Sequence, residues 1–159
     1  MSKARLAAVL LAGGLLAGCA SSGNGGVDTR FERAVGTGSA PDVLERSMKV
    51  LRQYQFEIQQ QLEAPNIYIE TKWRPRVPFD DEVMIGVRLA QTRAIVRAKP
   101  RGTGGMGETY AVEVTVENRV QRTEVSDWLT DVVTPMYRKY ADQITSDFRN
   151  ELTIGVRKY

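Results

Sequence analysis

Residues 110–122 place the strongest constraint on the fold, because their side chains alternate between apolar and polar. Such alternation is typical of a β-strand that has one buried face and one face in water. A strand of this kind needs neighbouring strands to pair with and a second layer to cover its apolar side. The apolar positions are Tyr110, Val112, Val114 and Val116, and the polar set includes Glu113, Thr115, Glu117 and Arg119.

Two segments with the 3.6-residue period of a helix stand at either end of the strand-rich region. Ser39 is a candidate N-cap, and Pro41 falls in the first turn of the helix that it would begin. Thr134 and Pro135 predict the start of the second helix, and Gly155 predicts its end. The two apolar stripes comprise Val43, Leu44, Met48, Leu51 and Tyr54 in the first helix, and Tyr137, Tyr140, Ala141, Ile144, Phe148 and Leu152 in the second.

The remaining segments favour strands. Residues 27–35 are a candidate first strand, followed by a break at residues 36–38. Residues 56–59 and 67–74 alternate with period two on either side of a turn at 63–66, and residues 83–99 are long and rich in strand-forming types. The chain is therefore predicted to be a two-layer α+β domain, with two helices on an antiparallel sheet of about four to five strands, in the order β-α-β-β-β-β-α.

The first 18 residues have the organisation of a secretory signal. Residues 1–5 form a short basic segment, residues 6–16 are almost purely apolar, and two small residues precede Cys19. The apolar run is shorter than the roughly 20 residues that a membrane-spanning helix needs. These residues are therefore expected to direct export and to take no part in the folded domain.

The four residues Leu16-Ala17-Gly18-Cys19 resemble the lipobox of bacterial lipoproteins. The resemblance implies cleavage before Cys19 and attachment of lipid to its thiol, with more than one acyl chain giving stable anchoring. Ala20 stands where an Asp would imply retention at the inner membrane, so the resemblance implies the outer membrane. The expected division is a signal peptide at 1–18, the lipidated Cys19 with a Gly/Ser tether and the candidate first strand at 19–38, and one domain at 39–159.

Net charge and residue counts exclude several classes of function. The formal charge is +3, but removal of Lys3 and Arg5 with the signal leaves 20 basic and 19 acidic residues. This balance does not support recruitment of nucleic acid by bulk charge. With one cysteine and no histidine, the chain has no internal disulfide and lacks the ligands and bases of most metal and triad sites. We therefore predict no cofactor and no metal.

The predicted layout is also similar to that of small envelope lipoproteins with helix-grip domains. The examples are the C subunit of the barrel-assembly machinery and the lipoprotein of the lipopolysaccharide translocon. The similarity covers roughly 110 residues of layout and includes no shared motif, so it carries over no functional residue.

Two short motifs have both a chemical and a structural interpretation. Residues 102–107 match G-x-G-x-x-G, but they lie between two predicted strands, whereas dinucleotide binding needs a strand followed by a helix. A hairpin tip is favoured. The acidic run Asp80, Asp81 and Glu82 contains potential acid/base groups or ligands for a hard cation, although a solvated turn is favoured for it.

Basic residues in the middle of the chain are the best functional candidates. Arg93, Arg97 and Lys99 share one face of a predicted strand, as a patch for lipid phosphates or an acidic partner. The alternative is a solvated sheet face that is balanced by Glu113 and Glu117 across the strands. The predicted binding face comprises Arg88, Arg93, Arg97 and Lys99.

The sequence contains two tryptophans, and no spacing in it identifies a nucleophile together with its base. Trp73 is assigned to the core, and Trp128 to either the core or an interface. We expect a non-enzymatic, lipid-anchored protein of the outer membrane that faces the periplasm and binds an envelope protein. The alternative is a carrier or sensor that holds a small amphiphile in a groove between sheet and helix.

Overall fold

The computed structural model describes residues 30–156, apart from 105–106, 124–126 and 131. The predicted signal, Cys19 and the predicted tether lie outside the described residues. The elements follow one another as β1 (Arg30–Gly38), α1 (Ala40–Gln53), β2 (Ile58–Leu62), β3 (Ile67–Thr71), β4 (Arg74–Arg76), α2 (Asp80–Met84), β5 (Leu89–Gly104), β6 (Gly107–Gln121) and α3 (Pro135–Val156).

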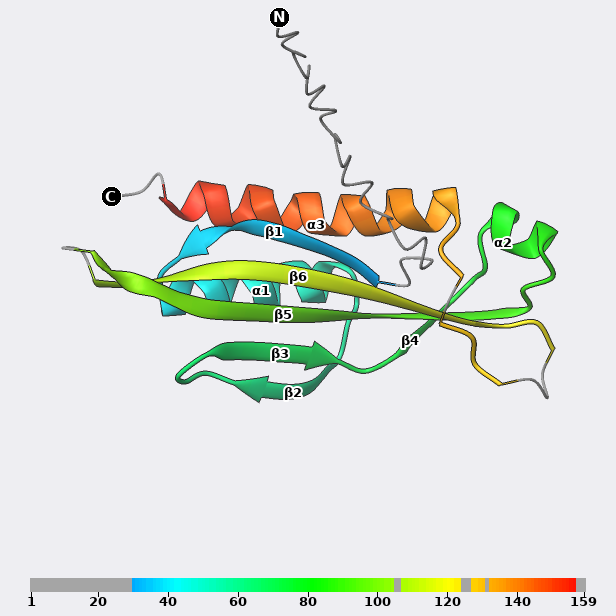
Figure 1. Ribbon diagram of the computed structural model, residues 1–159, viewed down its shortest axis with the longest axis horizontal. Coiled ribbons are helices and arrows are strands. Elements are labelled where there is room, and N and C mark those ends of the chain that lie inside the picture. The colour runs from blue at the N-terminus through cyan, green and yellow to red at the C-terminus, as the bar shows by residue number, and fades with distance from the viewer. Residues whose placement is uncertain (1–29, 105–106, 124–126, 131, 157–159) are drawn as a thin grey trace, which may run out of the picture.

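The strands form one antiparallel sheet in the order β1-β6-β5-β3-β2, and β4 pairs with β5 beyond the end of β3. Helices α1 and α3 cover one face of this sheet, and α3 lies alongside β1 (Figure 1). The fold is therefore of the α+β class, as the sequence predicts. It has one more strand and one more helix than expected, because β4 and α2 occupy a segment predicted as loop and strand.

Apolar side chains of the sheet and both long helices meet in one main core, and Val87, Ala90 and Val120 form a smaller separate cluster. The predicted alternation of residues 110–116 is confirmed, since Tyr110, Val112, Val114 and Val116 are all at most 5% exposed. At about 25 cal/mol for each Å² of apolar surface removed from water, this burial is the main stabilising term. The other core members are Phe31, Val35, Val43, Val50, Leu51, Phe56, Ile67, Ile69, Ala94, Val96, Ala98, Tyr137, Ala141, Ile144, Phe148 and Leu152.

Helix α1 begins as predicted. The Ser39 side-chain oxygen accepts a hydrogen bond from the Asp42 N–H at 3.3 Å, and Pro41 lies in the first turn. The buried stripe is displaced from the predicted one, because Ser47 and Val50 are buried while Leu44 and Met48 are only half-buried. The helix contacts both the sheet and α3, and this double contact decides which residues face inward.

Helix α3 also begins at the predicted residue, Pro135, and extends to Val156. This is one residue beyond the predicted stop at Gly155, within the usual precision of a helix end.

Three predicted strand boundaries are also wrong. The break predicted at residues 36–38 is a bulge inside β1, where the register shifts between Ala34 and Gly36 and the φ angle of Gly36 is +146°. Residues 83–88 do not belong to the long strand, because Val83 lies in α2 and β5 begins only at Leu89. The strand predicted at 67–74 ends at Thr71, whose side-chain oxygen accepts from the Ala94 N–H at 2.9 Å and replaces a ladder bond there.

The β5–β6 hairpin is the longest pairing in the sheet. In the G-x-G-x-x-G motif, residues 102–104 end β5 and Gly107 begins β6, while residues 105–106 lie outside the described residues. Because a strand follows the motif where dinucleotide binding needs a helix, the structure agrees with the hairpin interpretation.

Candidate functional site

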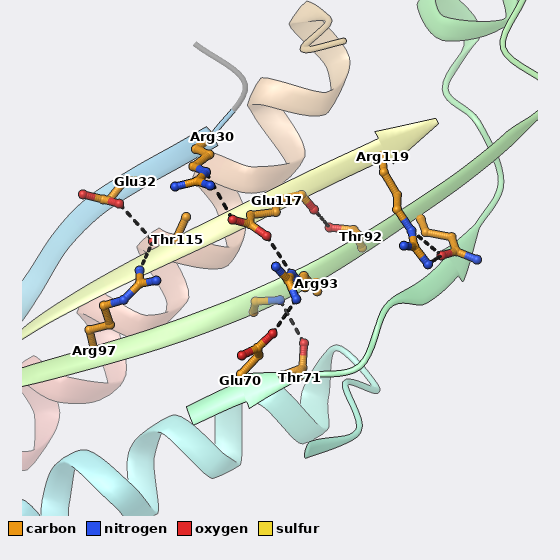
Figure 2. A network of polar contacts seen from close by, with 12 residues as sticks. Arg30, Glu32, Glu70, Thr71, Thr92, Arg93, Arg97, Thr115, Glu117 and Arg119 are labelled. Atoms are coloured by element: carbon orange, nitrogen blue, oxygen red, sulfur yellow. Dashed lines mark hydrogen bonds and ion pairs between the residues drawn. The ribbon is translucent and has the colours of Figure 1, made fainter. Parts of the chain in front are cut away.

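The face of the sheet that α1 and α3 leave uncovered carries a network of charged side chains (Figure 2). Arg93, at the centre of β5, connects three strands. Its Nε donates to Glu117 of β6 at 2.6 Å, and its Nη1 donates to Glu70 of β3. The strand register explains this arrangement, because Arg93 lies directly opposite Glu117 and Glu70 pairs with Ile95, two residues further along β5.

The network continues to the edge strand β1. Glu117 also forms an ion pair with Arg30, whose Nε lies 3.4 Å from the Glu117 Oε1. Further along, Arg97 donates to the Thr115 hydroxyl at 3.1 Å, and that hydroxyl donates to Glu32 at 3.1 Å. The balancing carboxylates that the sequence predicted are therefore present, since Arg93 lies opposite Glu117 and Arg97 opposite Glu113.

Glu113 lies beside a second carboxylate in this network. Its pKa is raised, first because it shares a hydrogen bond with Glu32 and then because of partial burial, while Lys99 and Arg97 act in the opposite direction. Two neighbouring carboxyls favour retention of a proton by one of them. Glu113 is only half-buried on the sheet surface.

Both tryptophans contribute to this same face. The Arg119 guanidinium lies 4.3 Å from the Trp73 ring centre and 4.7 Å from that of Trp128, and Arg93 lies 4.7 Å from Trp73. The Nε of Arg119 also donates a hydrogen bond to the Gln91 side-chain oxygen at 2.8 Å. Burial, and then the nearby charge of Arg93, lower the pKa of Arg119.

The predicted position of Trp73 in the core is wrong. Trp73 follows the end of β3, is half-buried, and stacks with arginines on the charged face. Thr71 marks the end of the strict alternation, so the pattern that placed Trp73 with Ile67 and Ile69 no longer applied at residue 73. Trp128 is half-buried on the same face.

The four predicted binding residues do not form one continuous patch. Arg93 and Arg97 belong to the network just described, whereas Arg88 and Lys99 are exposed near opposite ends of the sheet. Eleven residues separate these two, which is about 36 Å along an extended strand. Lys99 lies beside Arg97, and Arg88 lies beside α2.

Lys99 and Arg97 line a groove at the β2–β3 hairpin, with a volume of about 500 Å³. The guanidinium of Arg97 lies 5.7 Å from the Tyr68 ring centre. The Tyr68 hydroxyl donates to Glu70 at 2.6 Å. The remaining lining residues are Gln60, Leu62, Ala64, Pro65, Asn66, Ile67 and Ala98.

The acidic run at 80–82 is not the solvated turn that the sequence favoured. Glu82 is fully buried, and its carboxylate accepts hydrogen bonds from both terminal nitrogens of Arg76, at 2.7 and 2.5 Å. Its carboxylate also accepts from the Phe79 N–H at 2.8 Å, which caps α2, and from the Asn118 side chain at 3.1 Å. Asp81 accepts from the Met136 N–H at 2.8 Å.

This buried cluster was missed because Asn118, which completes it, lies 36 residues from Glu82 in the sequence. Glu82 stands three residues after Phe79, where a helix-capping Glu is common, and this is the one local signal. The cluster joins β4, α2 and β6, and the Glu82 carboxylate is already engaged by Arg76, Asn118 and the Phe79 N–H. We therefore assign the cluster a structural role.

The described residues contain no group of three acidic, His or Cys side chains arranged to hold a metal. Within the same residues, no helix combines the length and the apolar character that crossing a membrane would require.

Comparison with known proteins provides no family for this chain. No family model matches the sequence, and no curated protein matches it.

Proposed function

We propose that this protein is a lipid-anchored, non-enzymatic accessory component of an envelope assembly, and that the open face of its sheet binds a protein partner. The observation that carries the proposal is the Trp73–Arg119–Trp128 stack on a sheet face that none of the described helices covers. Tryptophan and arginine are the residues that most often dominate the energy of protein interfaces.

The fixed positions of the arginine side chains on this face also support a role in binding. Arg93 and Arg119 each contact three other side chains, so their positions are fixed before a partner arrives. Pre-ordering reduces the entropy lost when long side chains become immobile on binding.

The lipobox resemblance supplies the proposed location. A protein acylated at Cys19 and lacking Asp at position 20 is directed to the outer membrane, with the domain facing the periplasm. Anchoring raises the effective concentration of the face near membrane complexes, so that weak contacts suffice.

The test is cross-linking and affinity purification of the full-length acylated protein from membranes. The matched pair of variants is Arg119→Ala and Arg52→Ala, because Arg52 is exposed on α1, away from the open face. We expect a specific envelope protein to be recovered with the wild type and with Arg52→Ala, and to be lost with Arg119→Ala. Equal recovery with both variants contradicts the proposed face.

A separate measurement tests the anchor. Cys19→Ser is expected to release the protein from the membrane fraction, because the thiol that would carry the lipid is absent. Unchanged fractionation of Cys19→Ser contradicts the lipid anchor.

The groove of about 500 Å³ at Tyr68 and Arg97 favours the second candidate, a carrier or sensor of a small amphiphile. This candidate uses the hairpin groove, where apolar walls adjoin Arg97 and Lys99. Saturable binding of a fluorescent fatty acid, weakened at least severalfold by Arg97→Gln, supports it. Binding that is unchanged by Arg97→Gln counts against it.

A further inference from the structure

Exposed apolar side chains gather at the end of the sheet where α2 lies. Among the described residues, eight large hydrophobic side chains are exposed, and six of them belong to this end. Residues 77–89 supply five, and the N–H of the sixth, Met136, is bonded to Asp81 of α2. We call these six the α2 patch: Val77, Val83, Met84, Ile85, Leu89 and Met136.

The α2 patch is held outward by the buried cluster beneath it. Glu82 is 0% exposed and bonded to Arg76, whereas Met84 is 86% exposed. Two residues correspond to about 200° around a helix, so fixing Glu82 inward directs Met84 into the solvent. Monomeric soluble proteins rarely gather large apolar side chains in this way without a binding role.

Four basic residues lie at the same end of the molecule as the patch, together with the exposed Asp80 of α2. Arg88 and Arg122 lie at the same end, because the Arg88 N–H donates to the Gln121 carbonyl, and Arg138 and Lys139 follow Met136. All four are exposed, and none forms an ion pair within the part of the chain that the structure describes. Apolar side chains bordered by Lys and Arg are typical of a surface that rests on anionic lipids.

The chain enters the fold near the same end. Arg30 pairs with Glu117, and Leu89, at the α2 end, pairs with Gln121. Four residues of β6, about 13 Å, separate these positions. Cys19 stands eleven residues before Arg30, and an extended chain of that length spans at most about 40 Å. A lipid at Cys19 therefore keeps the α2 patch within reach of the bilayer.

We propose that the α2 patch rests on the anionic phospholipid surface into which the lipid of Cys19 inserts, as a second contact that orients the domain. This inference depends on the lipid anchor of the proposed function. In this orientation β5 runs away from the membrane from Leu89 onward, so that the β2–β3 hairpin and the end of β5 at Gly104 are directed toward the compartment (Figure 1).

The test places an environment-sensitive dye on the acylated, full-length protein in vesicles of phosphatidylethanolamine and phosphatidylglycerol. Met84→Cys carries the dye in the patch. Glu63→Cys, in the exposed β2–β3 turn, is the matched control, since acylation consumes the only native thiol. We expect a blue shift and quenching by nitroxide lipids at position 84 and neither at position 63.

The remaining outcomes are distinguishable. Water-like emission at position 84 in protein whose Cys19 is acylated by mass spectrometry overturns the membrane contact and leaves the anchor intact. An unmodified Cys19 overturns the anchor, and the contact with it. A blue shift that appears without vesicles and grows with protein concentration indicates self-association through the patch, and also overturns the proposal.

A charged variant provides an independent check. Val83→Glu combined with Met84→Glu, with the dye moved to Met136→Cys, is expected to lose the blue shift in vesicles. Both residues are exposed, so the unfolding midpoint of the variant should match that of the parent. A blue shift that persists in this folded variant overturns the proposal.

Discussion

Glu82 and Arg76 form an ion pair whose side chains are only 0% and 6% exposed. Burial of a charge is costly unless its partner and hydrogen bonds are all in place. Here Asn118 bridges the two groups, accepting from Arg76 at 2.8 Å and donating to Glu82. Removal of one member therefore leaves the others buried without compensation.

We predict that Glu82→Ala lowers the free energy of unfolding by roughly 3–5 kcal/mol, because Arg76 is left buried without a counter-charge. Chemical denaturation followed by circular dichroism measures the change. Asp80→Asn, an exposed carboxylate on the same helix, is the control and should have little effect. A loss of less than about 1 kcal/mol for Glu82→Ala means that the pair is more hydrated than its burial indicates.

The ionised carboxylate of Glu113, in contrast to that of Glu82, lowers the stability of the folded protein. Its raised pKa means that the folded protein holds a proton more tightly than the unfolded chain. Stability therefore falls as the pH rises from the ordinary glutamate pKa, about 4.3, through the raised value. We predict that Glu113→Gln removes this slope and makes the protein more stable than the wild type near neutral pH.

Unfolding midpoints measured across the acidic to neutral range check the prediction for Glu113. Glu45→Gln, an exposed carboxylate on α1, is the control and should keep the slope. A Glu113→Gln variant with the same pH dependence as the wild type contradicts an interaction between Glu113 and Glu32.

Among the elements, β1 depends on a bulge that a side chain would strain. Gly36 has a φ angle of +146°, and a Cβ there would meet only Leu152 at ordinary contact distance, 3.7 Å. The cost of an alanine is thus conformational rather than steric. The bulge lets β1 continue pairing with β6 to Gly38, directly before the N-cap of α1.

We predict that Gly36→Ala destabilises the protein by about 1–3 kcal/mol, because alanine rarely adopts this backbone conformation. Thr37→Ala, the next residue in the same strand, is the control and should cost less. Thermal unfolding compares the two variants. Equal stability of Gly36→Ala and the wild type shows that β1 can pair without the bulge.

For the whole molecule, the order of the sheet sets the pattern of local stability. Strands β5 and β6 lie inside the sheet, and the edge strand β1 is covered by α3, whereas β2 is an edge strand whose residues 59–62 are exposed. Few buried contacts and exposed hydrogen bonds permit local opening.

We predict that hydrogen exchange is slowest at residues 94–98 of β5 and 112–116 of β6, and faster by at least tenfold at residues 59–62 of β2. Exchange measured by mass spectrometry on the folded domain gives the comparison. Equal protection of β2 and β6 means that a further contact, such as a second copy of the chain, covers the β2 edge.

The sequence by itself determined the α+β class, both helix starts, the long hairpin and the strand at Tyr110–Val116. These features are local, since each depends on a period of two or 3.6 residues or on a cap such as Ser39. The lipobox is equally local, and its assignment to Cys19 stays a prediction from the sequence. The charge balance of Arg93 and Arg97 by Glu117 and Glu113 was also anticipated, because it follows from antiparallel pairing.

Only the tertiary structure decided where side chains meet when their partners lie far along the chain. The burial of Glu82 depends on Arg76 and on Asn118, 36 residues away, and the local spacing from Phe79 indicates a helix cap but not burial. Trp73 lies on the charged face because β3 ends at Thr71 and the Arg119 side chain of β6 packs against the indole ring. Periodicity describes one element at a time, whereas burial and pairing are set by the packing of all of them.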